Sequence, residues 1–292
     1  MITKKRWILS VDLLIASEQV ILRNLEEAFK KCRKAKGEEM ILKEGGNVFK
    51  NEDGTPVTQR INQADVDPTL QWAEKIVGFD LVNHKLGSTG IRSTSGDMDI
   101  AVDKDKVSKD ELVAKLKAWK DKNAPDDEDR AWIAKSGINV HFKAPIKGDV
   151  KNGFVQLDLM FGEPEFMKFA MKGSGDDTPY KGMHRAVLIS SIAKFHGYKF
   201  NSQTGLVDRI TNKTVSKNPD EIAQYLLGDN AKGQDLDSVE TIVAKIKGDP
   251  NYKAMVDDAM KYFEKDGLKL PEAVQLQGRE WFRHTLDKLN EV

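Results

Sequence analysis

Cysteine is almost absent from this sequence: Cys32 is the single one among 292 residues. One thiol cannot form an intramolecular disulfide, and it cannot supply a zinc cluster built from cysteines. The chain also has no excess charge of either sign, since 46 Lys and Arg balance 46 Asp and Glu. Zero net charge argues against a protein that coats nucleic acid through bulk electrostatics, and leaves room only for a local basic groove.

Long hydrophobic runs are missing as well, and none approaches the roughly 20 residues of a membrane helix. The segment 4–16 imitates a secretion signal, because basic residues precede an apolar stretch, but Asp12 interrupts that stretch and no small-residue cleavage site follows. We therefore expect a soluble, cytoplasmic protein with no membrane partner. With 39% hydrophobic residues, the chain is long enough for two domains with their own cores.

Hydrophobic periodicity predicts an α+β fold with two domains. The first, residues 1–175, is expected to hold a mixed sheet with flanking helices and an N-terminal helical extension. The second, residues 176–292, is expected to be mostly helical with one β-hairpin. Predicted strands are 79–86, 97–102, 137–145, 153–161 and the hairpin 199–215; predicted helices are 10–36, 68–77, 108–120, 126–135, 180–197, 219–228, 235–248, 250–265 and 271–290.

The stretch Asp97-Met98-Asp99 is the first candidate for chemistry. Side chains alternate between the faces of a strand, so the two carboxylates point the same way while Met98 points to the apolar side. Two carboxylates side by side repel each other unless a cation neutralises them. Mg²⁺, which prefers oxygen ligands and substrate phosphates, is the natural partner.

A third acid, Asp158, interrupts the β-prone run 155–161. Aspartate is disfavoured inside a strand, and its presence is explained if this strand lies beside the one that carries Asp97 and Asp99. Three converging carboxylates could hold two Mg²⁺ ions about 3.5–4 Å apart, an arrangement suited to in-line phosphoryl displacement.

Gly87-Ser88 precedes the paired acids. A glycine after a strand lets backbone N–H groups approach a phosphate, and the Ser88 hydroxyl can donate to the same group. A helix beginning near Thr89 would add the positive end of its dipole. These residues together predict a turn that binds phosphate.

In this order and spacing, Gly87-Ser88, Asp97-Met98-Asp99 and Asp158 resemble the motifs of the DNA polymerase β-like nucleotidyltransferase superfamily. The resemblance covers roughly residues 79–162, and the eight residues between Ser88 and Asp97 make the turn short for that family. It implies a nucleotidyltransferase fold and an enzyme that transfers a nucleoside monophosphate from an NTP, with release of pyrophosphate.

The resemblance also implies roles for individual residues. Asp97 and Asp99 would bridge two Mg²⁺ ions, with Mn²⁺ as a substitute, and Asp158 would complete the metal site that activates the acceptor hydroxyl. Gly87 and Ser88 would hold the β- and γ-phosphates. The candidate charge partners of the triphosphate are Arg92, Lys181 and Arg185.

The acceptor stays open at this stage. An RNA 3′ end is one hypothesis, as for tRNA nucleotidyltransferases and poly(A) polymerases; a protein or small-molecule acceptor is the second, and an inactive nucleotide-binding module the third. The segment 181–217 carries seven Lys and Arg against one Asp, which favours a polyanion. The sequence names neither the acceptor nor the NTP, ATP being one candidate.

Three other features receive structural interpretations. His141 lies on the predicted strand 137–145, which is expected to pair with the Asp158 strand, and is interpreted as a structural histidine. The acids 126–129 are expected to cap the helix 126–135. The segment 173–177 is interpreted as a flexible connection between domains.

Overall fold

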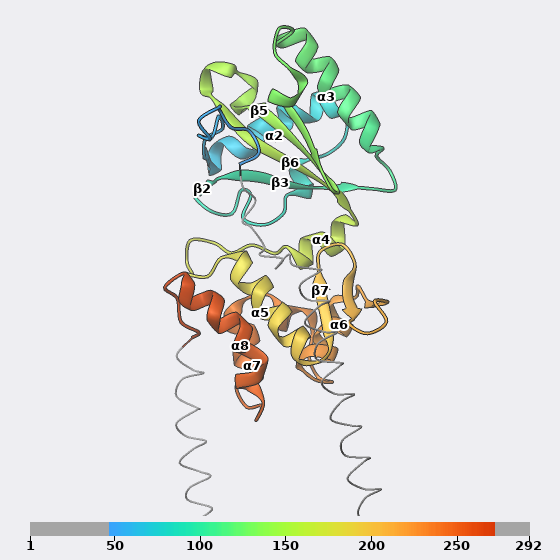
Figure 1. Cartoon of the computed structure of the whole chain (residues 1–292), viewed down its shortest axis with the longest axis vertical. Coiled ribbons are helices and arrows are strands. Elements are labelled where there is room, and N and C mark those ends of the chain that lie inside the picture. The colour runs from blue at the N-terminus through green and yellow to red at the C-terminus, as the bar shows by residue number, and fades with distance from the viewer. Residues whose placement is uncertain (1–46, 272–292) are drawn as a thin grey trace, which may run out of the picture. The chain divides into compact units, whose positions relative to one another are not determined.

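The computed structural model describes residues 47–271, all of which lie in one compact unit of the chain. The fold is α+β, as predicted, and contains a mixed four-stranded sheet in the order β3-β6-β5-β4 (Figure 1). β3 runs parallel to β6, whereas β5 is antiparallel to both of its neighbours. The four strands are β3 (Asp97–Asp103), β4 (Ile133–Ser136), β5 (Asn139–Pro145) and β6 (Phe154–Gly162).

The other elements surround this sheet or follow it in sequence. Two smaller sheets pair β1 with β2 and β7 with β8 and β9. Their strands are β1 (Ile61–Asn62), β2 (Thr94–Ser95), β7 (Tyr198–Asn201), β8 (Gly205–Asp208) and β9 (Thr214–Ser216). The helices are α2 (Gln63–Val77), α3 (Lys109–Asn123), α4 (Pro164–Ala170), α5 (Gly182–Phe195), α6 (Pro219–Leu227), α7 (Val239–Ile246) and α8 (Tyr252–Lys265).

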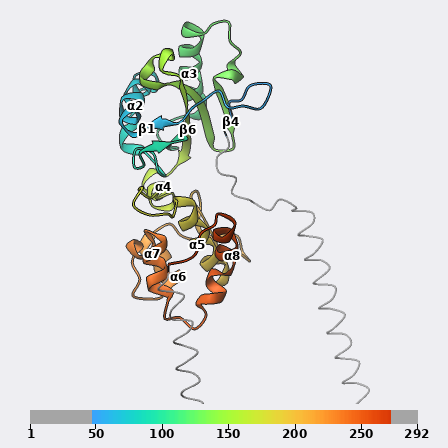
Figure 2. The ribbon, with the colours of Figure 1, turned by 90° about the vertical axis from the view of Figure 1, so that its left-hand side faces the viewer.

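One face of the four-stranded sheet is buried under α2 and α3 (Figure 2). Met98 and Ile100 of β3 and Leu157 of β6 are fully buried in this core, together with Leu70 of α2 and Leu116 of α3. Burying one such side chain stabilises the fold by about 1.5–3 kcal/mol. Because side chains alternate along each strand, the same packing directs Asp97, Asp99 and Asp158 to the opposite face.

A second core lies among α5, α6, α7, α8 and the sheet of β7, β8 and β9. Helix α4 contributes Phe166 and Ala170 to this second core. The same helix contributes Met167 to a small third cluster with Leu86 and Ala101, so α4 packs on both sides. The domain division expected near residue 175 stays a prediction.

Two predicted elements are wrong. Residues 79–86 do not form a strand, because the Glu74 carboxylate accepts the N–H groups of Leu81 and Val82 (2.8 and 3.0 Å) and the chain turns through a 3₁₀-helix at Val82–His84. Residues 126–135 do not form a helix, because Ile133–Ser136 pairs with β5 as an edge strand. The predicted helix caps at 126–129 are therefore also wrong; the Asp127 carboxylate instead accepts the Trp132 indole N–H at 2.7 Å.

Several boundaries differ as well. Helix α2 begins at Gln63, so Pro68 lies inside it and not at its start. The predicted helix 235–248 is divided into a 3₁₀-helix at Gly233–Leu236 and α7. The predicted helices 10–36 and 271–290 fall on residues outside the described range, apart from position 271. Within 47–271, none of the helices combines the length and the apolar character that crossing a bilayer requires.

Candidate active site

Three carboxylates meet on the face of the sheet opposite α2 and α3. Asp99 and Asp158 are direct register partners on the parallel strands β3 and β6, and Asp97 lies two residues earlier on the same face as Asp99. Each of the three offers one oxygen, and these oxygens lie within 4.8 Å of one another. The structure thus brings together the acids that alternation and strand order predicted to converge.

Burial and mutual repulsion both disfavour negative charge in this cluster. Burial, and then the neighbouring charges of Asp97 and Asp158, raise the pKa of Asp99 well above its usual value. A divalent cation would relieve the repulsion, and a set of oxygen donors suits a hard cation such as Mg²⁺ or Mn²⁺. The donor set therefore fits a divalent metal.

Asp158 is held by two neighbouring side chains. His141 Nδ1 lies 2.7 Å from Asp158 Oδ1, and Gln156 Nε2 donates to Asp158 Oδ2 at 3.0 Å. The Val48 N–H in turn donates to Gln156 Oε1 at 2.7 Å. His141, interpreted as a structural histidine, thus contacts one member of the acid cluster. The predicted pairing of the strands 137–145 and 153–161 is confirmed, and His141 is the register partner of Asp158. The sequence signal for this contact is a polar residue on each of two strands that were predicted to pair.

The Gly87-Ser88 turn lies directly against Asp99. Leu86 N–H donates to the Asp99 carbonyl at 2.8 Å, and Asp99 N–H donates to Thr89 Oγ1 at 2.9 Å. A Cβ on Gly87, whose φ is +58°, would lie 3.3 Å from Asp99 Oδ2. A group bound by this turn would therefore lie beside the carboxylates. The helix expected near Thr89 is absent: residues 88–91 form a turn, so a helix dipole does not contribute here.

The segment that follows α4 braces this turn. The backbone of Gly173 lies so close that a Cβ there would be 2.0 Å from Gly87 O, and Gly87 N–H donates to the Met171 carbonyl at 3.0 Å. Arg92 donates from Nε to Ser174 O at 3.1 Å and from Nη2 to Tyr180 O at 3.2 Å. The connection interpreted as flexible is thus packed against the candidate phosphate turn.

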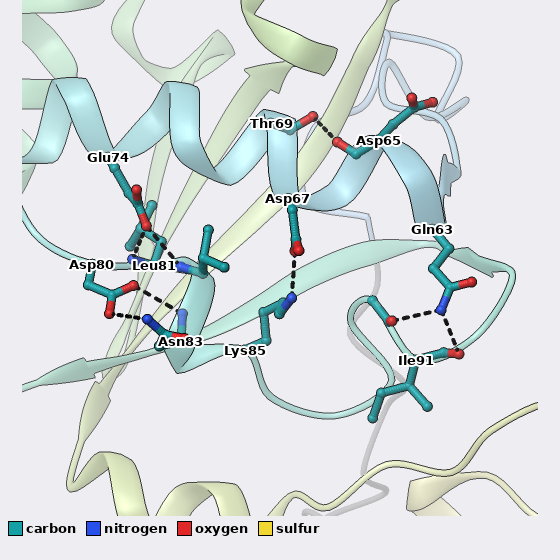
Figure 3. A network of polar contacts seen from close by, with 12 residues as sticks. Gln63, Asp65, Asp67, Thr69, Glu74, Asp80, Leu81, Asn83, Lys85 and Ile91 are labelled. Carbon is teal, nitrogen blue, oxygen red and sulfur yellow. Dashed lines mark hydrogen bonds and ion pairs between the residues drawn. The ribbon is translucent and has the colours of Figure 1, made fainter.

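Helix α2 supports the turn from the other side (Figure 3). Gln63 Nε2 donates to the carbonyls of Gly90 and Ile91 at 3.0 and 3.3 Å. Lys85, just before the turn, forms an ion pair with Asp67 of α2 (Figure 3). The turn is therefore held by segments that precede and follow it in sequence.

The predicted cationic partners of the triphosphate occupy different environments. Arg92 is engaged in bracing the turn, as described above. Lys181 is exposed and lies immediately before α5. Arg185 is 2% exposed; its Nη1 donates to Ala170 O at 3.1 Å and its Nε to Leu236 O at 2.5 Å. Burial lowers the pKa of Arg185 to about 10. Arg185 therefore joins α4, α5 and the 233–236 turn and is not exposed to a ligand.

The basic segment 181–217 is partly neutralised by ion pairs. Lys194 pairs with Asp258 of α8, and Lys217 pairs with Glu163 at 2.6 Å. Lys199, Arg209 and Lys213 are exposed, and no acidic partner is found for them among residues 47–271. Of these three cations, Lys199 lies on β7, and Arg209 and Lys213 lie in the connection between β8 and β9.

Comparison with known proteins gives little guidance. No family model matches the sequence, and no curated protein matches it. Among solved structures, the chain is similar to Leishmania infantum polymerase beta in a ternary P/T complex, with 13% identity over 62% of this chain and 72% of that chain and a TM-score of 0.34. A likeness this weak supports no conclusion about function.

Proposed function

We propose that this protein is a divalent-metal-dependent nucleotidyltransferase, which transfers a nucleoside monophosphate from an NTP to an acceptor hydroxyl and releases pyrophosphate. The observation that supports the proposal is the set of three carboxylate oxygens within 4.8 Å on neighbouring parallel strands. The Gly87-Ser88 turn beside Asp99 is where the triphosphate would bind. Clustered acids next to a glycine turn suit the joint binding of hard cations and phosphates.

In this proposal Asp97, Asp99 and Asp158 would hold two Mg²⁺ ions, for which Mn²⁺ can substitute, and Asp158 would complete the metal site that activates the acceptor hydroxyl. When bound, the ions neutralise charge on the phosphates and lower the pKa of the acceptor hydroxyl. The three carboxylates fix where this happens, because each is anchored to a strand of the central sheet.

The phosphates are oriented by the turn. Gly87 and Ser88 hold the β- and γ-phosphates, and Arg92 keeps the turn in place through Ser174 and Tyr180. Lys181 is the candidate charge partner, whereas buried Arg185 receives no phosphate. The acceptor hydroxyl loses its proton to solvent and its oxygen bonds to the α-phosphorus as the bond from that phosphorus to the bridging oxygen breaks, and pyrophosphate leaves.

An RNA 3′ end is the proposed acceptor. The exposed cations Lys199, Arg209 and Lys213, without acidic partners in the described range, support a polyanionic substrate. A protein or small-molecule acceptor is the second candidate, favoured by the ion pairs that neutralise Lys194 and Lys217.

The test is transfer of label from each α-³²P NTP, with Mg²⁺ or Mn²⁺, to pools of RNA, protein and small molecules. Labelled acceptor and released pyrophosphate should form in equal amounts. Thermal stabilisation by NTP without transfer to any pool would contradict catalysis and leave a nucleotide-binding module.

Matched variants of β3 make this test specific. Asp97→Asn and Asp99→Asn should each abolish transfer while the protein stays folded, because each removes a metal ligand and leaves the core intact. Asp103→Asn is the control: it lies on the same strand and face but pairs with Lys106 at 3.0 Å. Turnover near wild type in either cluster variant would refute the proposed site.

A further inference from the structure

Asp158 has a side-chain partner on each of its oxygens. His141 lies 2.7 Å from Oδ1 and Gln156 lies 3.0 Å from Oδ2. The side chains of His141 and Asp158 are each 7% exposed, so water competes little for this contact. The contact crosses two antiparallel strands, because His141 of β5 is the register partner of Asp158 of β6.

The direction of this hydrogen bond follows from chemistry. A carboxylate that binds a cation is ionised and can only accept, so His141 must donate from Nδ1. Gln156 is oriented in the same way: its Oε1 accepts the Val48 N–H at 2.7 Å, which leaves Nε2 to donate to Asp158. Both neighbours thus present donors to the ionised form.

We propose that His141 is a positioning residue for Asp158. Its Nδ1–H fixes the Asp158 carboxylate in the orientation that brings its oxygen within 4.8 Å of those of Asp97 and Asp99, where the three share a cation. Without that donor, repulsion from the other two acids would turn the carboxylate away. Hydrogen-bonding partners of ligating carboxylates typically contribute about 10- to 100-fold to metal affinity or activity.

Two variants separate this role from simple filling of space. His141→Leu keeps a similar side-chain volume but removes the donor. His141→Asn places an amide nitrogen one bond from Cγ, as Nδ1 is in histidine. Asn139→Leu is the matched control, since Asn139 lies two residues away on the same face of β5, opposite Met160, and its buried Oδ1 has no partner among the described residues.

The measurement is Mn²⁺ affinity of the full chain without nucleotide, by titration calorimetry or electron paramagnetic resonance, with thermal unfolding alongside. We expect His141→Leu to weaken binding by about 10- to 100-fold, His141→Asn to regain most of it, and Asn139→Leu to bind as wild type. In turnover assays of His141→Leu, kcat should fall by a larger factor than the factor by which KM for the NTP changes, because the Gly87-Ser88 turn is untouched.

A folded His141→Leu protein with wild-type Mn²⁺ affinity would overturn the proposal, as would equal losses in the Leu and Asn variants. If His141→Leu does not fold, His141→Gln replaces it, because the glutamine amide nitrogen lies one bond further from Cγ than the asparagine nitrogen does. The His141→Asn protein must then bind Mn²⁺ more tightly than the His141→Gln protein. The inference rests on the proposed function only for its kinetic readout. If the wild type binds Mn²⁺ but transfers nothing, the proposed function fails and the affinity comparison still decides on His141. A wild type that binds no Mn²⁺ refutes both.

Discussion

Replacing Gly173 by alanine should damage nucleotide binding without touching a carboxylate. A Cβ at this position would lie 2.0 Å from Gly87 O and 2.7 Å from Ser88 N, whereas real Cβ contacts are essentially never below 3.0 Å. The turn or the facing segment must therefore move by at least about 1 Å, and Arg92 ties both together. The backbone of Gly173 is not in the left-handed region, so the whole effect is steric.

Two magnitudes follow from that displacement. Misplacing a substrate-positioning element by 1 Å costs about 100-fold in rate, so kcat/KM for the NTP should fall by roughly that factor. Overpacking should also lower the free energy of unfolding by about 1–3 kcal/mol, measured by urea denaturation. Mn²⁺ affinity should fall much less than kcat/KM, because the three carboxylates proposed to bind the ion lie on β3 and β6, although the turn contacts Asp99.

Gly175→Ala is the control for this prediction. Its Cβ would meet the Asp177 carboxylate at 2.6 Å, but that side chain can rotate away, and the nearest backbone atom lies 4.0 Å away. We expect wild-type kinetics for Gly175→Ala. Wild-type kcat/KM in Gly173→Ala would refute the assignment of Gly87-Ser88 as the phosphate turn.

Two further predictions concern stability. Asp99→Asn should raise the free energy of unfolding of the metal-free protein by about 0.5–2 kcal/mol, because burial and two neighbouring carboxylates disfavour the charged form of Asp99. Adding Mg²⁺ at 100 times its Kd should stabilise the wild type by about 2.7 kcal/mol. The same addition should not stabilise the Asp99→Asn variant. Chemical denaturation with and without Mg²⁺ measures both, and a less stable Asp99→Asn would contradict the repulsion argument. Arg185→Gln should lower the free energy of unfolding by about 1–3 kcal/mol, because buried carbonyls of Ala170 and Leu236 lose their donors. Selective loss of NTP affinity with unchanged stability would instead place Arg185 at the phosphates.

The acids of the site were predictable from local sequence. Alternation alone places Asp97 and Asp99 on one face of a strand, and an aspartate inside an apolar strand marks Asp158. Such patterns are readable because strand geometry fixes side-chain direction every second residue. The α+β class followed from the same periodicities.

Local sequence misled where a partner outside the segment decided the conformation. Residues 79–86 have the composition of a strand, yet the Glu74 carboxylate captures two N–H groups and turns the chain. Residues 126–135 resemble a helix, but Trp132 O accepts the Lys143 N–H at 2.8 Å and the next residues join the sheet edge. Intrinsic propensities are small and are overridden by such contacts.

The sequence by itself determined which residue types could hold metal and phosphate, and on which face of a strand they lie. Tertiary structure decided how they are held: His141 against Asp158, Gly173 against Gly87, and Arg185 in a buried core. These contacts join residues 17, 86 and 51 positions apart, respectively, the last between Arg185 and Leu236. No local periodicity encodes such distances, because the packing of whole elements sets which side chains meet.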